Sequence, residues 1–177
     1  MDYISIIDKY YTKGELRDLL LLHSEAVTRR ALAIIAKHPE LNVNARFVEE
    51  AAMLHDIGII HCDAPSIFCH GTEPYIRHGI MGARMLRAEG CPEHARVCER
   101  HTGAGISREE IIRRKLPLPV QSYLPETTEE QLICYADKFY SKSKPNREKT
   151  IAQAEHSLLK YGTDGVERFR HWVEMFE

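Results

Sequence analysis

Apolar side chains recur at intervals of three or four residues along most of this chain, with polar side chains between them. This spacing is typical of helices that bury one face. It predicts helices over residues 4–10, 16–36, 45–54, 75–88, 93–101, 129–141, 148–159 and 166–176. Runs of alternating apolar and polar residues are too short to predict a sheet. The pattern therefore favours an all-α fold, a compact bundle of about seven or eight helices.

The segments between the predicted helices carry boundary signals. The spacing of a capping box, which marks a helix start, occurs at Ser107 with Glu110 and at Thr127 with Glu130. Two longer connections cover residues 59–74 and 116–126, and the second is rich in proline. Loops on a rigid helical scaffold commonly determine specificity, although plain connection is the simpler interpretation of both.

Composition narrows the class of protein further. The 177 residues suffice for one domain with a substantial core. A formal net charge of −2 gives no overall attraction to nucleic acid or to anionic membranes, so we expect neither as a partner. No leader segment is evident, and five cysteines without a CxxC pair indicate reduced thiols, so we expect a cytoplasmic protein. The oligomeric state cannot be read from the sequence.

Six ionisable side chains lie within or beside apolar stripes of the predicted helices, where burying an unpartnered polar group is costly. Two of them, His55 and Asp56, are adjacent at the end of the apolar run 47–54. The other four are His23, His78, His101 and Asp137. One such residue is more often structural, but six that can converge in a small helical domain indicate a function. Imidazoles and carboxylates together suit Fe, Mn, Co, Ni or Zn.

The chain resembles the HD-domain superfamily of metal-dependent phosphohydrolases, through His23, the doublet His55-Asp56, and Asp137. The doublet continues into Ile57-Gly58, which is similar to the HDIG form of the motif. The segments around His78 and His101 resemble the additional histidine motifs of members that hold two metals.

The resemblance covers roughly residues 15–142 and implies one HD domain over residues 1–177, with C-terminal helices in 145–176. It also implies two divalent ions, which would be Fe, Mn, Co, Ni, Zn or Mg. The ligands of the first ion would be His23, His55, Asp56 and Asp137, and those of the second His78 and His101, with Asp56 bridging both.

Some features of the superfamily are absent. Ile59 stands where many HDIG members have Lys or Arg, and no GYP motif is present, which argues against cyclic dinucleotide hydrolysis. Arg100-His101 stands where binuclear HD-GYP members have a histidine pair, so the second ion has one ligand fewer. A Glu-Asp motif of the alarmone hydrolases is also missing before Asp137, which argues against a guanosine tetraphosphate substrate.

The resemblance implies hydrolysis of a small phosphate ester, with a nucleotide as one candidate, by a metal-activated water centred on Asp56. Lys138 and Arg77 each adjoin a proposed ligand and are the first candidates for phosphate contacts, although a solvated basic face would look the same. Lys142 follows Lys138 by four residues, hence on the same helix face. His61 and Asp63 are candidates for orienting ligands or for acid–base catalysis.

Two other functions fit the same residues. HD-type di-iron oxygenases, which cleave C–C or C–P bonds, resemble this ligand arrangement, and ligands alone do not separate the two classes. A non-catalytic nucleotide-binding module is the second alternative, but the intact ligand set argues against it.

Overall fold

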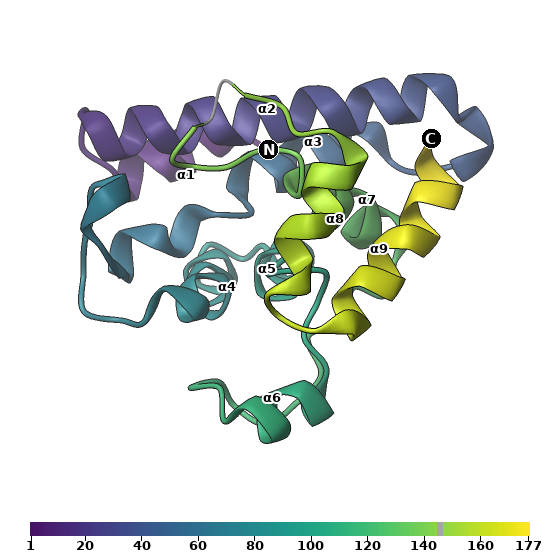
Figure 1. Ribbon diagram of the computed structural model, residues 1–177. Helices are drawn as coiled ribbons and strands as arrows, with labels where there is room; N and C mark the ends of the chain where they lie inside the picture. Colours follow the sequence, from purple (N-terminus) through teal and green to yellow (C-terminus); the bar gives the residue numbers. More distant parts are fainter. Residues whose placement is uncertain (145–146) are drawn as a thin grey trace.

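The helices form largely where the apolar period predicts them. The computed structural model describes residues 1–144 and 147–177. In this part of the chain nine α-helices follow one another (Figure 1). They are α1 (Tyr3–Tyr10), α2 (Glu15–Lys37), α3 (Ala45–Leu54), α4 (His78–Ala88), α5 (Pro92–Arg100), α6 (Arg108–Arg114), α7 (Thr128–Asp137), α8 (Ile151–Leu159) and α9 (Thr163–Phe176). The predicted all-α fold is confirmed.

Helix α6 and the end of α7 differ from the prediction by period alone. The capping box at Ser107 begins the seven residues of α6, whose few apolar side chains are too short a run to predict a helix. The predicted helix 129–141 ends at Asp137, and the chain then turns. Both predicted capping boxes are present.

The predicted loop 59–74 is more structured than a plain connection. It contains 3-10 helices at Ile57–His61 and Pro65–Ile67 and an antiparallel pair of two-residue strands, β1 (Asp63–Ala64) and β2 (Cys69–His70). A further 3-10 turn, Tyr75–Arg77, leads directly into α4. The predicted start of the C-terminal helices at residue 145 lies outside the described residues.

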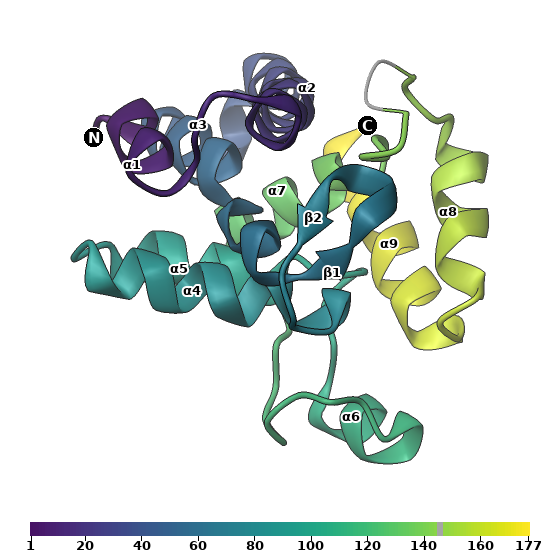
Figure 2. The same cartoon turned by 90° about the vertical axis from the view of Figure 1, so that its left-hand side faces the viewer.

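The buried side chains form two main clusters that share α2 and α3. One cluster lies among α2, α3, α7, α8 and α9 and includes Tyr135, Phe139 and Phe169. The other lies among α1, α2, α3, α4 and α5 and includes Leu54 and Leu86. Figure 1 shows α2 running along the molecule above the ends of α4 and α5, and Figure 2 shows α8 and α9 paired at one end. Polar residues at the junction of the clusters are therefore removed from solvent.

Two glycines allow the elements beside this junction to approach closely. A Cβ on Gly58 would lie 2.1 Å from the carbonyl oxygen of His78, and a Cβ on Gly79 would lie 2.4 Å from the carbonyl oxygen of Cys98. Contacts this short with backbone atoms are possible only without a side chain. Glycine thus permits the segment after the doublet, α4 and α5 to pack against one another.

None of the helices in the described residues combines enough length with enough apolar character to cross a membrane. The longest, α2, carries charged residues throughout its 23 positions.

Candidate metal centre

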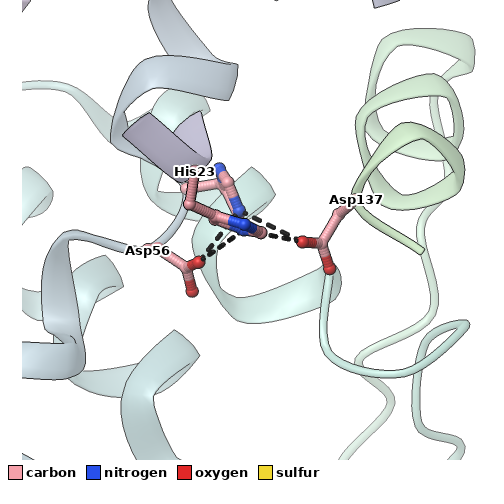
Figure 3. Close-up of side chains that lie close together, drawn as sticks. His23, Asp56 and Asp137 are labelled. Carbon is pink, nitrogen blue, oxygen red and sulfur yellow. Dashed lines mark hydrogen bonds and ion pairs between the residues drawn. The ribbon is translucent and has the colours of Figure 1, made fainter. Parts of the chain in front are cut away.

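Four of the predicted ligands converge at the junction of the two core clusters. His23 comes from the middle of α2, His55 and Asp56 from the end of α3, and Asp137 from the last position of α7. Figure 3 shows the carboxylates of Asp56 and Asp137 on opposite sides of the His23 ring. Each of the four offers one ligand atom, and these atoms lie within 4.8 Å of one another.

The distances within this first group suit a common ion. His23 Nε2 lies 3.0 Å from Asp137 Oδ1 and 3.2 Å from Asp56 Oδ2. His55 Nε2 lies 3.1 Å and 3.6 Å from the same two oxygens, respectively Asp56 Oδ2 and Asp137 Oδ1. Neighbouring ligand atoms about 2.1 Å from one ion are separated by roughly 3.0–3.4 Å, so the four atoms can share one coordination sphere.

A second group shares Asp56 with the first. His78, the first residue of α4, and His101, which follows α5, bring their Nε2 atoms to 3.5 Å and 3.3 Å from Asp56 Oδ1. The other oxygen of the carboxylate, Oδ2, faces His23 and His55. Asp56 therefore presents one oxygen to each group.

Hydrogen bonds fix the orientation of three of the histidine rings. The Nδ1 atoms of His55, His78 and His101 lie 2.6–2.7 Å from the carbonyl oxygens of Ala52, Tyr75 and Cys98, each three residues earlier in the chain. A carbonyl oxygen only accepts, so each Nδ1 donates. The rings of His78 and His101, and that of His55 once its Nε2 proton is lost, then present an Nε2 lone pair to the centre, as metal-binding histidines do.

The charges of the groups differ in the metal-free protein. Burial and the neighbouring His101 lower the pKa of His78 to about 3, and burial lowers the pKa of His101. Burial also acts to lower the pKa of His55, but the Asp56 charge and a hydrogen bond with Asp137 outweigh it and raise that pKa to about 9. Near neutral pH one proton therefore resides on His55, between the two carboxylates.

Unsatisfied polar atoms show that this set of side chains fits a bound cation. His78 Nε2 and His101 Nε2 lie 3.0 Å apart, although both rings are neutral and both already donate through Nδ1. His55 Nε2 and both oxygens of Asp56 are also buried, and among the described residues they have ion-pair neighbours but no hydrogen bond of good geometry. Such groups are costly to bury unless a ligand binds them. The mixed nitrogen and oxygen donor set is one that divalent transition metals accept.

Two lysines neutralise the carboxylates of the cluster. Lys142 Nζ lies 2.5 Å from Asp56 Oδ2, and Lys138 Nζ lies 2.7 Å from Asp137 Oδ2. Burial opposes ionisation of both acids, but the neighbouring groups together outweigh it, with Lys142 the largest of them at Asp56 and Lys138 at Asp137, so both pKa values stay well below the usual range. Lys142 was expected on the helix face of Lys138. It reaches the site instead from the turn after α7, because the helix ends at Asp137.

A cavity of about 670 Å³ opens over the cluster. His78, His101 and Asp137 form part of its wall, together with residues of the turn after α7 and of α6, α8 and α9. Its basic side chains are Arg114, Lys138, Lys142, Lys149, Lys160 and Arg168. The sequence did not predict a place in this cavity for Arg114, Lys149, Lys160 or Arg168, because these residues lie outside the ligand motifs and no spacing rule connects them.

The remaining predicted catalytic residues lie outside this cavity lining. His61 and Asp63 are exposed, because the short hairpin directs this part of the loop outward. Arg77 pairs with Glu73, its Nε lying 3.1 Å from a Glu73 carboxylate oxygen. The geometry therefore brings Asp56 and Lys138 to the site and does not bring His61, Asp63 or Arg77 there.

Comparison with known protein families agrees with the fold and the cluster. A family model described as HD domain matches residues 20–141, about two thirds of the chain. The chain belongs to the HD-domain family. The matched range includes all six proposed ligands, and the HD domain with its buried His/Asp cluster fits a metal-dependent enzyme.

The chain is also similar to three curated proteins. The chain is 34% identical over 139 residues to a tRNA (cytidine(56)-2'-O)-methyltransferase of Thermoplasma volcanium, and 37% identical over 125 residues to the protein of the same name from Picrophilus torridus. These matches cover 78% and 70% of this chain but 36% and 32% of the relatives, so the chain spans about a third of their length. An uncharacterised protein of Methanocaldococcus jannaschii is 40% identical over 118 residues, which are 65% of this chain and 62% of that protein. No solved structure matches significantly.

Proposed function

We propose that this HD domain is a metal-dependent phosphohydrolase that cleaves phosphate esters with two divalent ions and an activated water. The position of Asp56 carries the proposal, because its two carboxylate oxygens face two different groups of ligands. His23, His55 and Asp137 would hold one ion together with one Asp56 oxygen, and His78 and His101 would hold a second together with the other Asp56 oxygen. Bound ions of this kind lower the pKa of a water toward neutrality and stabilise charge on phosphoryl oxygens.

Lys138 and Lys142 act on the substrate in this proposal. Both ammonium groups line the cavity and lie beside the ligand carboxylates. Each can donate a hydrogen bond to a phosphoryl oxygen, and a charge-assisted bond of this type is stronger than a neutral one. Positive charge fixed in a partly buried site also stabilises the negative charge that develops in the transition state.

The cavity favours an anionic substrate over a neutral one. Six lysine and arginine side chains line it, whereas its carboxylates are Glu110 and Asp137, each already paired with one of those cations. This balance supports a phosphate ester. A di-iron oxygenase acting on a phosphonate would also meet an anionic substrate, so the two functions differ in their need for dioxygen.

The methyltransferase name of two relatives does not by itself assign methyl transfer to this chain. Those proteins extend well beyond the matched third, and the Methanocaldococcus jannaschii relative, which is matched over 62% of its own length, carries no such name. We assign their named reaction to the part outside the match. The name does bear on the substrate. The net charge led us to expect no nucleic-acid partner, but relatives named for tRNA do not support that expectation. A phosphate on an RNA end therefore joins free nucleotides as a candidate substrate.

The test combines metal analysis with an anaerobic assay. The purified chain, loaded with Mn²⁺ or Co²⁺, should bind about two ions and release phosphate from nucleotides or from phosphorylated oligoribonucleotides without dioxygen. The Asp56→Asn variant should lose ions from both groups. Its turnover should fall at least about 100-fold, which is a larger loss than substitution of residues that only orient metal ligands usually causes. Asp63→Asn, the same substitution at an exposed position, should retain both ions.

Two results would contradict the proposal. One is an Asp56→Asn variant with full turnover. The other is product formation that requires dioxygen, which would indicate the oxygenase chemistry instead.

A further inference from the structure

The cavity extends from the proposed metal centre to a second group of cations at its other end. Arg114, from the last position of α6, and Lys160, directly after α8, are both part of its wall, as is Tyr161. Most of this far wall lies outside the part of the chain that the HD-domain model matches, residues 20–141. It is therefore an addition to the shared domain.

The Tyr161 ring lies close to both cations of this far wall, Arg114 and Lys160. The Arg114 guanidinium carbon lies 5.4 Å from the centre of the Tyr161 ring, and Lys160 Nζ lies 4.7 Å from it. Both distances are within the range of cation–π contacts. Two like charges on one ring repel each other, and an anion between or beside them removes that repulsion.

Acidic side chains do not already neutralise this end of the cavity. Among residues 1–144 and 147–177, Arg114, Lys149 and Lys160 form no ion pair, whereas Lys138, Lys142 and Arg168 each do. Lys149 is half-buried and donates to the carbonyl oxygen of Lys138 at 3.1 Å. Burial and the charge of Lys138 lower the pKa of Lys149, as expected where positive charge is in excess. Lys149 thus lies on the side of Lys138 and the metal-binding residues, and Arg114 and Lys160 remain available to a ligand at the far end of the same cavity.

We propose that the far end of the cavity, formed by Arg114 and Lys160, binds a second phosphate group of the substrate. The inference rests on the proposed function, because the first phosphate would lie at the metal centre. The substrate is then a molecule with two phosphates, either the polyphosphate chain of a nucleotide or successive phosphates at the end of an RNA. Phosphate monoesters with no second anionic group contact the near cations alone.

Binding measurements separate these possibilities without requiring turnover. Calorimetry with the full chain would compare three probes: adenosine 5′-monophosphate, adenosine 5′-(α,β-methylene)diphosphate and a 5′-phosphorylated diribonucleotide of adenosine. A second charge-assisted contact should make at least one of the two-phosphate probes bind about 10-fold or more tightly than the monophosphate. The probe that shows the gain identifies the polyphosphate or the RNA end as the source of the second phosphate.

Substitutions then locate the second phosphate. Arg114→Gln and Lys160→Gln should each lower the affinity ratio between the two-phosphate and one-phosphate probes toward one. Arg113→Gln is the matched control, because it removes the same charge from the neighbouring residue. The side chain of Arg113 pairs with Asp164 at 2.9 Å and does not line the cavity. It should leave the ratio unchanged.

The inference and the proposed function fail in different ways. If neither two-phosphate probe binds more tightly than the monophosphate, or if the gain survives both Arg114→Gln and Lys160→Gln, the second phosphate site is overturned even in an active hydrolase. If the gain is present and depends on these residues but no phosphate is released with any metal, the site stands and the hydrolase proposal fails.

Discussion

Lys142 Nζ lies 2.5 Å from Asp56 Oδ2, so an ammonium group neutralises the carboxylate that would bridge the two ions. The lysine side chain is 13% exposed and Asp56 is fully buried, so water screens the pair little. Burial acts to lower the pKa of Lys142, but Asp56, Tyr75 and Asp137 together outweigh it and raise that pKa well above its usual value, so the lysine stays charged. The metal-free protein is therefore stabilised by a charge that competes with an ion for the same oxygen.

Replacing this lysine should separate metal binding from substrate binding. Lys142→Met keeps most of the apolar stem and removes the charge, so we expect ions to bind as tightly as in the wild type or more tightly. We expect KM for a phosphate substrate to rise about 10-fold, because a charge-assisted hydrogen bond is lost. Metal titration and steady-state kinetics measure the two effects. Weaker metal binding in Lys142→Met would show that the lysine supports the ligands instead of competing with the ion.

Metal affinity should depend on pH through His55. Its raised pKa of about 9 means that an ion must displace a proton from the ring at any lower pH. The apparent affinity of the first group should therefore rise by up to about tenfold per pH unit from pH 7 toward pH 9 and level off above that. Competition with a chromophoric chelator measures the affinity, and calorimetry in two buffers counts the released proton. An affinity that is constant between pH 7 and pH 9 would be inconsistent with a proton on His55.

The second group can be tested separately from the first. His78 contributes to the second group alone, so His78→Gln should lower the metal content from about two ions per chain to about one. Elemental analysis after gel filtration measures the content. His61→Gln, at an exposed position outside the cavity lining, is the matched control and should retain both ions. A His78→Gln variant that still binds two ions would exclude the proposed second site.

The glycine of the HDIG segment should be required for packing. Gly58→Ala places a methyl group against the backbone of His78 and Gly82, at 2.1 Å and 2.2 Å before any relaxation. We expect the free energy of unfolding to fall by about 3 kcal/mol, the upper part of the range for overpacked cores. In Gly165→Ala the nearest atom is 3.7 Å away, so this control should be neutral or slightly stabilising. Urea unfolding of both variants provides the measurement, and equal stability would argue against a steric role for Gly58.

The apolar period predicted most helices well because most of them bury one stripe. Its failures have local causes. In α6 the capping box at Ser107 and the packing of Ile111 stabilise a helix that is too short for a periodic signal. Helix α7 ends at Asp137 although apolar residues continue, because Phe139 packs into the core from the turn that follows.

The ligand residues were predictable because burial makes an ionisable side chain in an apolar stripe unusual. The cations of the cavity were not, because an exposed lysine in a loop and a lysine that faces a cavity look the same in a sequence. Lys142 shows the difference: the expectation of a helix face was wrong, and only the turn after α7 brings the side chain to Asp56. Arg77 was expected at the site for its position before His78, but its pairing with Glu73 directs it away.

The bonds from the histidine Nδ1 atoms to carbonyl oxygens three residues earlier connect the ligand set to the backbone. For His55 and His101 those oxygens belong to the last turns of α3 and α5, where a helix has no backbone donor of its own to offer them. Fraying of either helix end would break this hydrogen bond and allow the imidazole to rotate away from the metal site. Metal binding and the stability of these terminal turns are consequently coupled: bound ions should increase the amide protection of the turns, and more stable turns should increase the affinity for ions. The loss of side-chain entropy needed to orient the ligands occurs during folding, before any ion arrives.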